Sequence, residues 1–289
     1  MKTILITGIN GFLGSHIAKK LSGEYEVIGI EYSVENLWRL EGASFEVYTS
    51  NDASLKKIFE KHQIFAIIHA ATVYRTINES ISDILNTNIL LPVKLYELAN
   101  KYKISTFLNT DSFFNDKKHQ YSYLSEYTQS KNNALEWLKL LNVSGTCKLV
   151  NMKIFHMYGP GDALTKFIPS ILLKIKENTP SLDLTEGKQT RDFIYIDDVV
   201  KAFEVVLNKY NEIPSFKEFE IGTGNEVSLF EMVSLMKELS ESSTILNFGA
   251  LPYRDGEIME SKADNIELFN LGFNIENSIQ IGLLKVLNN

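Results

Sequence analysis

The sequence predicts an α/β protein with a doubly wound parallel (Rossmann) sheet and a smaller C-terminal substrate-binding lobe. Over the first half of the chain, short apolar strands alternate with amphipathic helices. A glycine-rich turn follows the first strand, and the alternation loosens beyond about residue 160. Apolar strands separated by helices are typical of parallel sheets covered on both faces. Right-handed crossovers then give the doubly wound arrangement.

The predicted elements follow one another in a regular order. Strands are predicted at residues 3–7, 26–30, 44–48, 65–71, 106–110 and 149–155. Amphipathic helices are predicted between them, at residues 15–21, 54–62, 81–102 and 126–141. Later helices at residues 167–178 and 228–239 are separated by short strands and by loops rich in Gly, Asn and Asp. We therefore expect a Rossmann domain at residues 1–160, to which some later segments return, and the smaller lobe at residues 161–289.

Composition and charge limit the classes of function. The 289-residue chain has a net charge of -7 at pH 7, which argues against a nucleic acid as its main partner. The single cysteine, Cys147, allows no internal disulfide and is typical of a reducing compartment. Neither this cysteine nor the five histidines have the spacing of metal ligands, so no metal site is expected. No apolar run reaches the roughly 18 residues of a membrane span, and we expect a cytoplasmic protein.

The glycine-rich turn is the main indication of a nucleotide site. Gly8, Gly11 and Gly14 lie between the first predicted strand and the first helix. The first permits a tight turn, the second lets backbone N–H groups approach a pyrophosphate, and the third lets helix and strand pack closely. Glu31 ends the second strand, where a carboxylate accepts hydrogen bonds from ribose hydroxyls and repels a 2′-phosphate. This favours NAD(H), while Arg39 keeps NADP(H) open as an alternative.

A tyrosine and a lysine form the candidate catalytic pair. Among the 13 tyrosines, only Tyr127 has a lysine, Lys131, four residues later on the same face of a predicted helix. A phenol has a pKa of about 10, and a nearby ammonium, helped by a bound nicotinamide cation, favours the phenolate. The alternative is an exposed helix pair that adds little to stability.

These motifs resemble the extended short-chain dehydrogenase/reductases, in the branch of NAD-dependent nucleotide-sugar epimerases, dehydratases and reductases. The resemblance runs through TGINGFLG, IIHAAT, NTNILLPVKLYELA, the Tyr/Lys pair, HMYGPGD, GKQTRDFIYIDDVVKAF and EIGTGNEVSLFEM. It implies that Tyr127 is the general acid/base and that Lys131 holds the nicotinamide ribose and lowers the tyrosine pKa. The cofactor contacts that it implies are Gly8, Asn10, Gly11, Phe12, Leu13, Gly14, Glu31, Ala70, Ala71, Asn88, Tyr127 and Lys131.

The resemblance also implies a Ser or Thr at the end of the fifth strand that hydrogen-bonds the reacting oxygen. Ser112 is the preferred match and Thr110 its competitor, since both lie on the same side of an extended strand. With Ser112 in this role, Phe113 and Phe114 stand where a sugar 4,6-dehydratase needs its acid and base. With Thr110 in this role, Asp111 supplies the acid but Ser112 replaces the base. Water elimination is therefore not expected.

The second half carries candidate substrate-binding residues. Arg191 and Arg254 resemble the arginines with which this family clamps a nucleoside diphosphate, and a guanidinium offers phosphate a fork of donors. The alternative is that these arginines pair with Asp192 or Asp255. His156 stands where the family has an Asn before YGPG, so a substrate contact is expected there as well.

The predicted function is that of an NAD(P)-dependent nucleotide-sugar oxidoreductase. The first choice is reduction of a 4-keto-6-deoxy or 3,6-dideoxy nucleotide hexose, because NTDSFFN, HMYGPGD and the short segment from Ser112 to Tyr127 resemble 4-ketoreductases of CDP-linked 3,6-dideoxyhexoses. A nucleotide-sugar 4-epimerase is the alternative and suits Glu31 better, because an epimerase retains its cofactor. A non-catalytic dinucleotide-sensing protein is the alternative of another class, against which the Tyr/Lys pair argues. We also expect a homodimer through the helices at residues 84–102 and 125–141.

Overall fold

The computed structural model describes residues 1–74, 79–115 and 124–288. These residues divide into two compact units. One holds most of residues 1–153 together with residues 202–219, and the other holds residues 154–201 and 220–288. Most of the short segment between Ser112 and Tyr127 lies outside the described residues.

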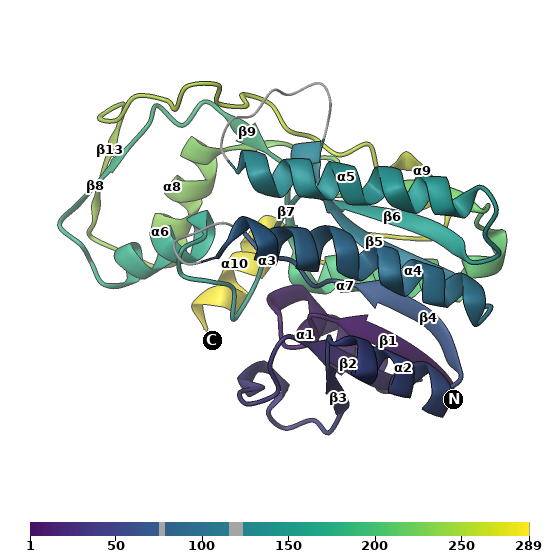
Figure 1. The fold of residues 1–289 in the computed structure, drawn as a ribbon. Helices are drawn as coiled ribbons and strands as arrows, with labels where there is room; N and C mark the ends of the chain where they lie inside the picture. The colour runs from purple at the N-terminus through teal and green to yellow at the C-terminus, as the bar shows by residue number, and fades with distance from the viewer. Residues whose placement is uncertain (75–78, 116–123, 289) are drawn as a thin grey trace. The chain divides into compact units, whose positions relative to one another are not determined.

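The first unit is built on a seven-stranded sheet in the order β11-β6-β5-β4-β1-β2-β3 (Figure 1). Parallel ladders join β1 to β2 and β4, β2 to β3, and β4 to β5. The strands are Lys2–Thr7 (β1), Tyr25–Glu31 (β2), Glu46–Thr49 (β3), Ile64–His69 (β4), Thr106–Ser112 (β5), Lys148–Ile154 (β6) and Phe216–Ile221 (β11). The strand order reverses between β1 and β4, and in doubly wound sheets ligands bind at the carboxyl ends of the strands beside such a point. The predicted fold class is confirmed.

Three helices bury their apolar faces in one core cluster with this sheet. The helices of the first unit include Phe12–Leu21 (α1), Asp52–Lys61 (α2), Leu91–Lys101 (α4) and Ser125–Asn142 (α5). The cluster takes Leu55 and Ile58 from α2, Leu95 and Ala99 from α4, and Leu138 from α5. Leu95 and Ala99 are four residues apart and so share one helix face. Helices α4 and α5 lie side by side against the sheet (Figure 1).

The helix predicted at residues 81–102 contains a local irregularity. It consists of α3 (Ile81–Leu85), a π-helical turn η2 (Asn86–Leu90) and α4. The widened turn places Asn88 inside the protein, where none of its surface is exposed. Because π-turns within helices are often found at functional sites, this turn draws attention to Asn88.

The second unit contains short strands and helices held together by buried carboxylates. Asp192 accepts hydrogen bonds from the N–H groups of Thr223, Gly224 and Ala263 at 2.7, 2.8 and 3.1 Å. Asp198 accepts hydrogen bonds from the N–H and side-chain amide of Asn277 at 3.2 and 3.1 Å. The elements are His156–Tyr158 (β7), Phe167–Lys176 (α6), Ser181–Leu184 (β8), Thr190–Arg191 (β9), Phe193–Tyr195 (β10), Val227–Ser228 (β12), Leu229–Leu239 (α8), Ile245–Phe248 (β13), Ile266–Asn270 (α9) and Ile279–Leu287 (α10).

The helix α7 (Ile196–Asn208) contributes residues to both units. Single-turn 3-10 helices lie at Trp38–Leu40 (η1), Phe113–Asn115 (η3) and Tyr210–Glu212 (η4). Across the part of the chain that the structure describes, no helix is both long and apolar enough to cross a membrane.

Candidate active site

The glycine-rich turn joins β1 to α1 with almost no spare room. Gly8 has a φ of +63°, and a Cβ built there would lie 2.7 Å from Cα of Ala71. A Cβ on Gly14 would lie 2.1 Å from the carbonyl oxygen of Gly8, so neither position accepts a side chain. Helix α1 begins at Phe12, and its N-terminus has no side-chain cap and no acidic residue in the first turn. The first N–H groups of α1 are therefore suited to an anion such as a pyrophosphate.

The end of β4 is tied to the same turn. Thr7 Oγ1 accepts a hydrogen bond from the N–H of Ala71 at 3.1 Å and lies 2.9 Å from Nδ1 of His69. The N–H of Ala70 donates to the Thr7 carbonyl at 3.3 Å. These bonds hold Ala70 and Ala71 close to Gly8. Two motifs that lie far apart in the sequence thus meet at the carboxyl ends of β1 and β4.

Glu31 lies at the end of β2, beside the turn. Its carboxylate accepts hydrogen bonds from the N–H groups of Asn10 at 2.9 Å and Tyr32 at 3.0 Å. Asn10 Oδ1 accepts from the N–H of Arg39 at 3.1 Å, and the Arg39 guanidinium lies 4.1 Å from the centre of the Trp38 ring. Each carboxylate oxygen has two acceptor sites, so Glu31 can still accept hydrogen bonds from hydroxyl groups. The uncapped helix, the glycine turn and this carboxylate together fit a dinucleotide.

Helix α5 carries Tyr127 and Lys131 on its buried face. Their exposed fractions are 6% and 3%, which argues against the alternative of a solvent-exposed pair. The Lys131 ammonium donates to the backbone carbonyl of Thr110 at 2.9 Å and so ties α5 to the end of β5. The Tyr127 ring stacks on Tyr74, with ring centroids 4.4 Å apart and an angle of 24° between the planes.

The environment of this pair favours the neutral phenol. Burial raises the pKa of Tyr127 well above its usual value, Tyr74 and Asp111 act in the same direction, and the Ser112 side chain opposes them. Burial lowers the pKa of Lys131 to about 8, and the Asp111 carboxylate opposes this decrease. The sequence led us to expect a lowered tyrosine pKa, but burial of the phenol has the larger effect among the protein's own groups. The protein therefore holds Tyr127 in its neutral, protonated form.

Ser112 and Thr110, the two candidates for the third catalytic position, make different contacts. Both side chains are buried in β5. The hydroxyl of Ser112 acts on the phenol of Tyr127 and lowers its pKa, whereas Thr110 contributes its backbone carbonyl to Lys131. The contacts favour Ser112 as the hydroxyl that acts together with Tyr127.

Asp111 lies between these two residues in the sequence, and its carboxylate is engaged by the protein. It accepts hydrogen bonds from the N–H of Ser112 at 2.8 Å, Nδ2 of Asn115 at 3.0 Å and Nδ2 of Asn151 at 2.8 Å. Phe113 follows in η3 and is buried, with 6% of its surface exposed. The end of β5 therefore does not offer the two carboxyl groups that water elimination requires.

Asn88 makes contacts within the protein through both ends of its amide. It donates to the carbonyl of Val73 and to Ser130 Oγ, both at 2.9 Å, and accepts from the N–H of Val73 at 2.8 Å. Ser130 in turn donates to the backbone carbonyl of Tyr127 at 2.7 Å. Asn88 thus links the segment after β4 to the helix that carries the tyrosine. Its contact with the cofactor stays a prediction.

In the second unit, Arg191 is buried and paired. Its guanidinium forms an ion pair with Glu257 and donates to the carbonyl of Thr190 at 2.8 Å. Of the two partners considered from the sequence, Asp192 accepts hydrogen bonds from backbone N–H groups instead.

The other two predicted substrate contacts lie in different surroundings. The His156 ring lies against Phe193, with centroids 5.7 Å apart. Burial, together with the charge of Arg191, holds the pKa of His156 well below its usual value, so the imidazole is neutral. The side chain of Arg254 is exposed, and its backbone carbonyl accepts from the N–H of Glu257 at 3.1 Å. Glu257 therefore contacts both arginines of the predicted clamp.

Comparison with known proteins places the chain in a family. The pattern of the NAD dependent epimerase/dehydratase family matches residues 4–222. The chain belongs to this family. CDP-abequose synthase of Salmonella typhimurium is 35% identical over 276 residues, which cover 93% of this chain and 92% of that protein. CDP-abequose synthase of Salmonella muenchen is also 35% identical, over 99% of this chain and 97% of that protein.

A solved structure agrees with the fold. UDP-glucuronic acid 4-epimerase from Bacillus cereus, in complex with UDP-glucuronic acid and NAD, superimposes with a TM-score of 0.83. It is 24% identical, and the match covers 100% of this chain and 98% of that one. Family membership makes this chain an enzyme of the short-chain dehydrogenase/reductase type with NAD as its cofactor, as predicted from the sequence.

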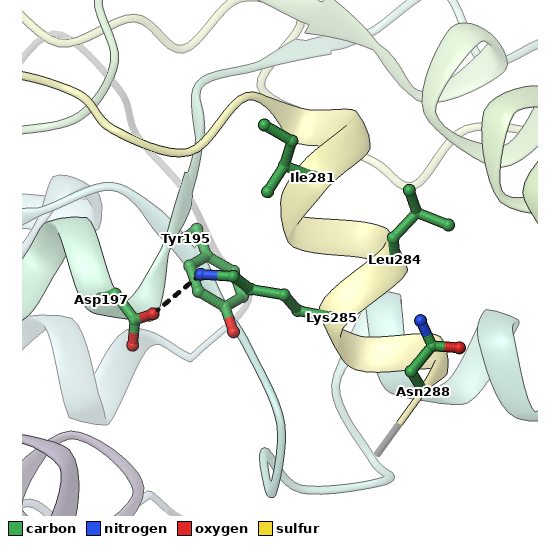
Figure 2. A pocket seen from close by; sticks show the side chains of 6 residues that line it. All are labelled: Tyr195, Asp197, Ile281, Leu284, Lys285 and Asn288. Carbon is green, nitrogen blue, oxygen red and sulfur yellow. Dashed lines mark hydrogen bonds and ion pairs between the residues drawn. The ribbon is translucent and has the colours of Figure 1, made fainter.

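A hollow on the second unit of this epimerase/dehydratase family member lies outside the predicted site (Figure 2). It has a volume of about 520 Å³. Its cation, Lys285, is held by Asp197 at 3.2 Å and by Asn277 Oδ1 at 2.8 Å. The charge of Lys285 is already compensated by Asp197, so the hollow offers little attraction to a diphosphate. The lining residues are Tyr195, Asp197, Ile281, Leu284, Lys285 and Asn288.

Three residues at the site were not identified from the sequence. Tyr74 stacks on Tyr127, but the sequence around it contains no spacing that pairs the two. Asn151 donates to Asp111. The sequence signal that could have identified it is that Asn151 is a polar residue within the apolar strand LVNMKIF. Glu257 pairs with Arg191 from a loop far along the chain, which no local pattern could indicate.

Proposed function

We propose that this enzyme is a nucleotide-sugar 4-ketoreductase that reduces a 4-keto-6-deoxy or 3,6-dideoxy nucleotide hexose. The observation that carries the proposal is the buried Tyr127, kept neutral beside Ser112 and Lys131. The 35% identity to CDP-abequose synthases over most of the chain supports the same choice and makes a CDP-linked sugar the first substrate to try.

The residues of the first unit have distinct roles in this reaction. The bound dinucleotide supplies the hydride that adds to the carbonyl carbon. Tyr127 donates its proton to the carbonyl oxygen, so the ketone becomes an alcohol. Ser112 holds that oxygen by a hydrogen bond, and the Lys131 ammonium stabilises the phenolate left on Tyr127. Gly8, Gly14 and the N-terminus of α1 would hold the pyrophosphate, and Glu31 would bind the adenosine ribose.

Arg191 and Arg254 are proposed to bind the diphosphate of the substrate. Arg191 is buried and paired with Glu257, so its guanidinium is held in one orientation before substrate binds. A guanidinium in a low-dielectric site binds phosphate oxygens more strongly than an exposed one. His156, neutral and next to Arg191 in space, is proposed to contact the sugar as a hydrogen-bonding group rather than as a charge.

A 4-epimerase is the second candidate. Glu31 favours it, because its carboxylate opposes a 2′-phosphate and an epimerase keeps one NAD through both half-reactions. An epimerase must also oxidise its substrate, and for this step Tyr127 must act as a base. The raised pKa of Tyr127 disfavours the phenolate, so the oxidation step is harder than the reduction step.

We also propose that the enzyme is a homodimer that pairs through α4 and α5. Trp137 and Leu140 on α5 are 55% and 64% exposed, and Leu85 and Leu90 beside α4 are 45% and 49% exposed. Large apolar side chains that cluster on neighbouring helices are typical of a surface that contacts another protein.

A substrate panel tests the proposed reaction. Purified enzyme is incubated with CDP-, dTDP-, UDP- and GDP-4-keto sugars and with NADH or NADPH, and the absorbance of the reduced nicotinamide is followed. We expect one ketosugar to oxidise one reduced cofactor, with CDP as the base, and Tyr127→Phe to lose at least about a hundredfold in kcat. Inversion at C4 without net oxidation would establish the epimerase instead. Full activity of Tyr127→Phe would rule out the catalytic role of the phenol.

A further inference from the structure

A network of buried and half-buried polar side chains connects strands β5, β6 and β11 of the first unit. Asn151, which has no exposed surface, donates to Asp111 at 2.8 Å and to Glu218 at 2.7 Å. Its Oδ1 accepts from Asn109 at 2.8 Å. Glu218 pairs in turn with Lys153 at 2.8 Å. The amide of Asn151 thus links the carboxylates of Asp111 and Glu218, and of these two only Glu218 is paired with a lysine that the structure describes.

Within the described part of the chain, the carboxylate of Asp111 has no paired cation within hydrogen-bonding distance, although it is only 4% exposed. Burying a charge costs free energy unless its hydrogen bonds compensate, and an apolar residue at such a position often gives equal or greater stability. Stability alone therefore does not explain a carboxylate here. The hydrogen-bond partners of Asp111 indicate a second role.

Asp111 also accepts hydrogen bonds from the segment Ser112–Asn115, which contains the end of β5 and the turn η3. The N–H of Ser112 and the amide of Asn115 both donate to it, at 2.8 and 3.0 Å. The first bond lies at the last residue of β5 and the second at the last residue of η3, so together they hold the segment from Ser112 to Asn115. The Ser112 hydroxyl accepts from the N–H of Phe114 at 3.4 Å and lowers the pKa of Tyr127. On the preceding residue, the carbonyl of Thr110 accepts from Lys131.

We propose that Asp111 is a positioning residue of this site. It fixes the turn after β5 so that the Ser112 hydroxyl meets Tyr127, and it keeps a negative charge near the Lys131 ammonium. The inference rests on the proposed roles of Tyr127, Lys131 and Ser112. In this role Asp111 acts through Ser112 and Lys131, and its carboxylate is engaged by donors of the protein.

Few other titratable groups face the pair. Tyr74 follows β4 and stacks on Tyr127. His69 ends β4, and burial followed by the charge of Lys131 holds the pKa of His69 well below its usual value. His69 is therefore neutral at the pH values at which Lys131 titrates. Among the described residues, Asp111 is the anion whose charge acts on both Tyr127 and Lys131.

The first test is the variant Asp111→Asn, which removes the charge and keeps an acceptor for the Ser112 N–H. Reduction needs a protonated Tyr127 and a charged Lys131, so the rate falls as pH rises through either pKa. Loss of the carboxylate lowers both pKa values. We expect the alkaline limb of the kcat profile to move to lower pH by about one unit.

A measurement that needs no substrate tests the role of Asp111 separately from the proposed function. The titration of Lys131 is followed by NMR in protein with isotope-labelled lysine, with the signal assigned by its loss in Lys131→Arg. We expect the Lys131 pKa to fall in Asp111→Asn. An unchanged Lys131 titration would overturn the role of the charge, even if no ketosugar of the panel were reduced.

The second variant, Asn115→Ala, tests the turn and leaves the charge in place. We expect kcat to fall about tenfold with little change in KM, and the alkaline limb to stay where it is. A kcat within twofold of the wild-type value would overturn the positioning of Ser112. If Asp111→Asn does not fold, this variant still tests the positioning of Ser112.

Asp198→Asn is the matched control. Asp198 is a carboxylate of the second unit that is 1% exposed and also accepts hydrogen bonds only from N–H groups of the protein. A structural role predicts a lower melting temperature with an unchanged pH profile. The same shift of the alkaline limb in Asp198→Asn would mean that the shift in Asp111→Asn is a general effect of losing a buried acid.

Discussion

The phenol of Tyr127 is kept protonated by its immediate surroundings, as the proposed proton transfer requires. Burial has the largest effect on its pKa, and Tyr74, whose ring stacks on Tyr127, raises it further. Tyr74→Phe keeps the stack and removes the hydroxyl. We therefore expect the Tyr127 pKa to fall and the alkaline limb of kcat for reduction to move to lower pH. The pH profile measures this, and an unmoved limb would show that the two hydroxyls do not interact during turnover.

Arg191 provides the second prediction at the scale of single residues. A lysine keeps the charge but cannot offer two parallel donors to a diphosphate. We expect Arg191→Lys to raise KM for the nucleotide sugar about tenfold and to change kcat by less than about threefold. Steady-state kinetics measure the two constants separately.

Glu257→Gln is the control for Arg191. It removes the ion-pair partner and leaves the guanidinium in place. The Gln oxygen still accepts a hydrogen bond from the guanidinium and so keeps its orientation. If Arg191 binds phosphate, we therefore expect this variant to keep its affinity for the nucleotide sugar. A rise in KM equal to that of Arg191→Lys would mean that the ion pair, and not a phosphate contact, is what matters.

Among the elements, the β1–α1 turn has the strictest steric requirement. A Cβ on Gly14 would lie 2.1 Å from the Gly8 carbonyl, whereas a Cβ on Gly23 would meet nothing within 4 Å. We expect Gly14→Ala to lose about 2 kcal/mol or more in the free energy of unfolding, and to lose NAD binding. Gly23→Ala, at an open position, should stay within about 0.5 kcal/mol of the wild type. Chemical denaturation and calorimetry with NAD measure both, and equal losses in the two variants would contradict the packing argument.

Elements that depend on local spacing could be predicted from the sequence. The three glycines and the Tyr/Lys pair can be recognised because each lies within one turn or one helix face. The π-turn at Asn86–Leu90 could not be predicted, because its inward Asn88 is stabilised by Val73 and Ser130 from other elements. The role of Asp111 was also hidden, because its partner Asn151 lies on another strand.

At the scale of the whole molecule, Lys131 affects the pH dependence of stability. Its pKa is 10.5 when unperturbed and about 8 in the folded protein. Between these values the unfolded chain binds more protons, so the contribution of Lys131 to stability rises with pH. Compared with Lys131→Met, the wild type should gain up to about 3 kcal/mol of unfolding free energy between pH 8 and pH 10.5. Urea denaturation at several pH values measures this, and a constant difference would contradict the lowered pKa.

The last prediction concerns the assembly of two chains. Trp137 and Leu140 lie three residues apart on α5, are more than half exposed, and lie on the helix that also carries Tyr127 and Lys131. Water contact of such side chains is unfavourable, at roughly 25 cal/mol per Å² of apolar surface, so a second copy that covers them gains free energy. We expect the wild type to sediment as a dimer at micromolar concentration and the double variant Trp137→Glu/Leu140→Glu to sediment as a monomer.

Leu164→Glu is the control, because Leu164 is 63% exposed but belongs to the second unit, and it should leave the dimer intact. A monomeric wild type would refute the dimer, and dissociation by Leu164→Glu alone would place the interface on the second unit.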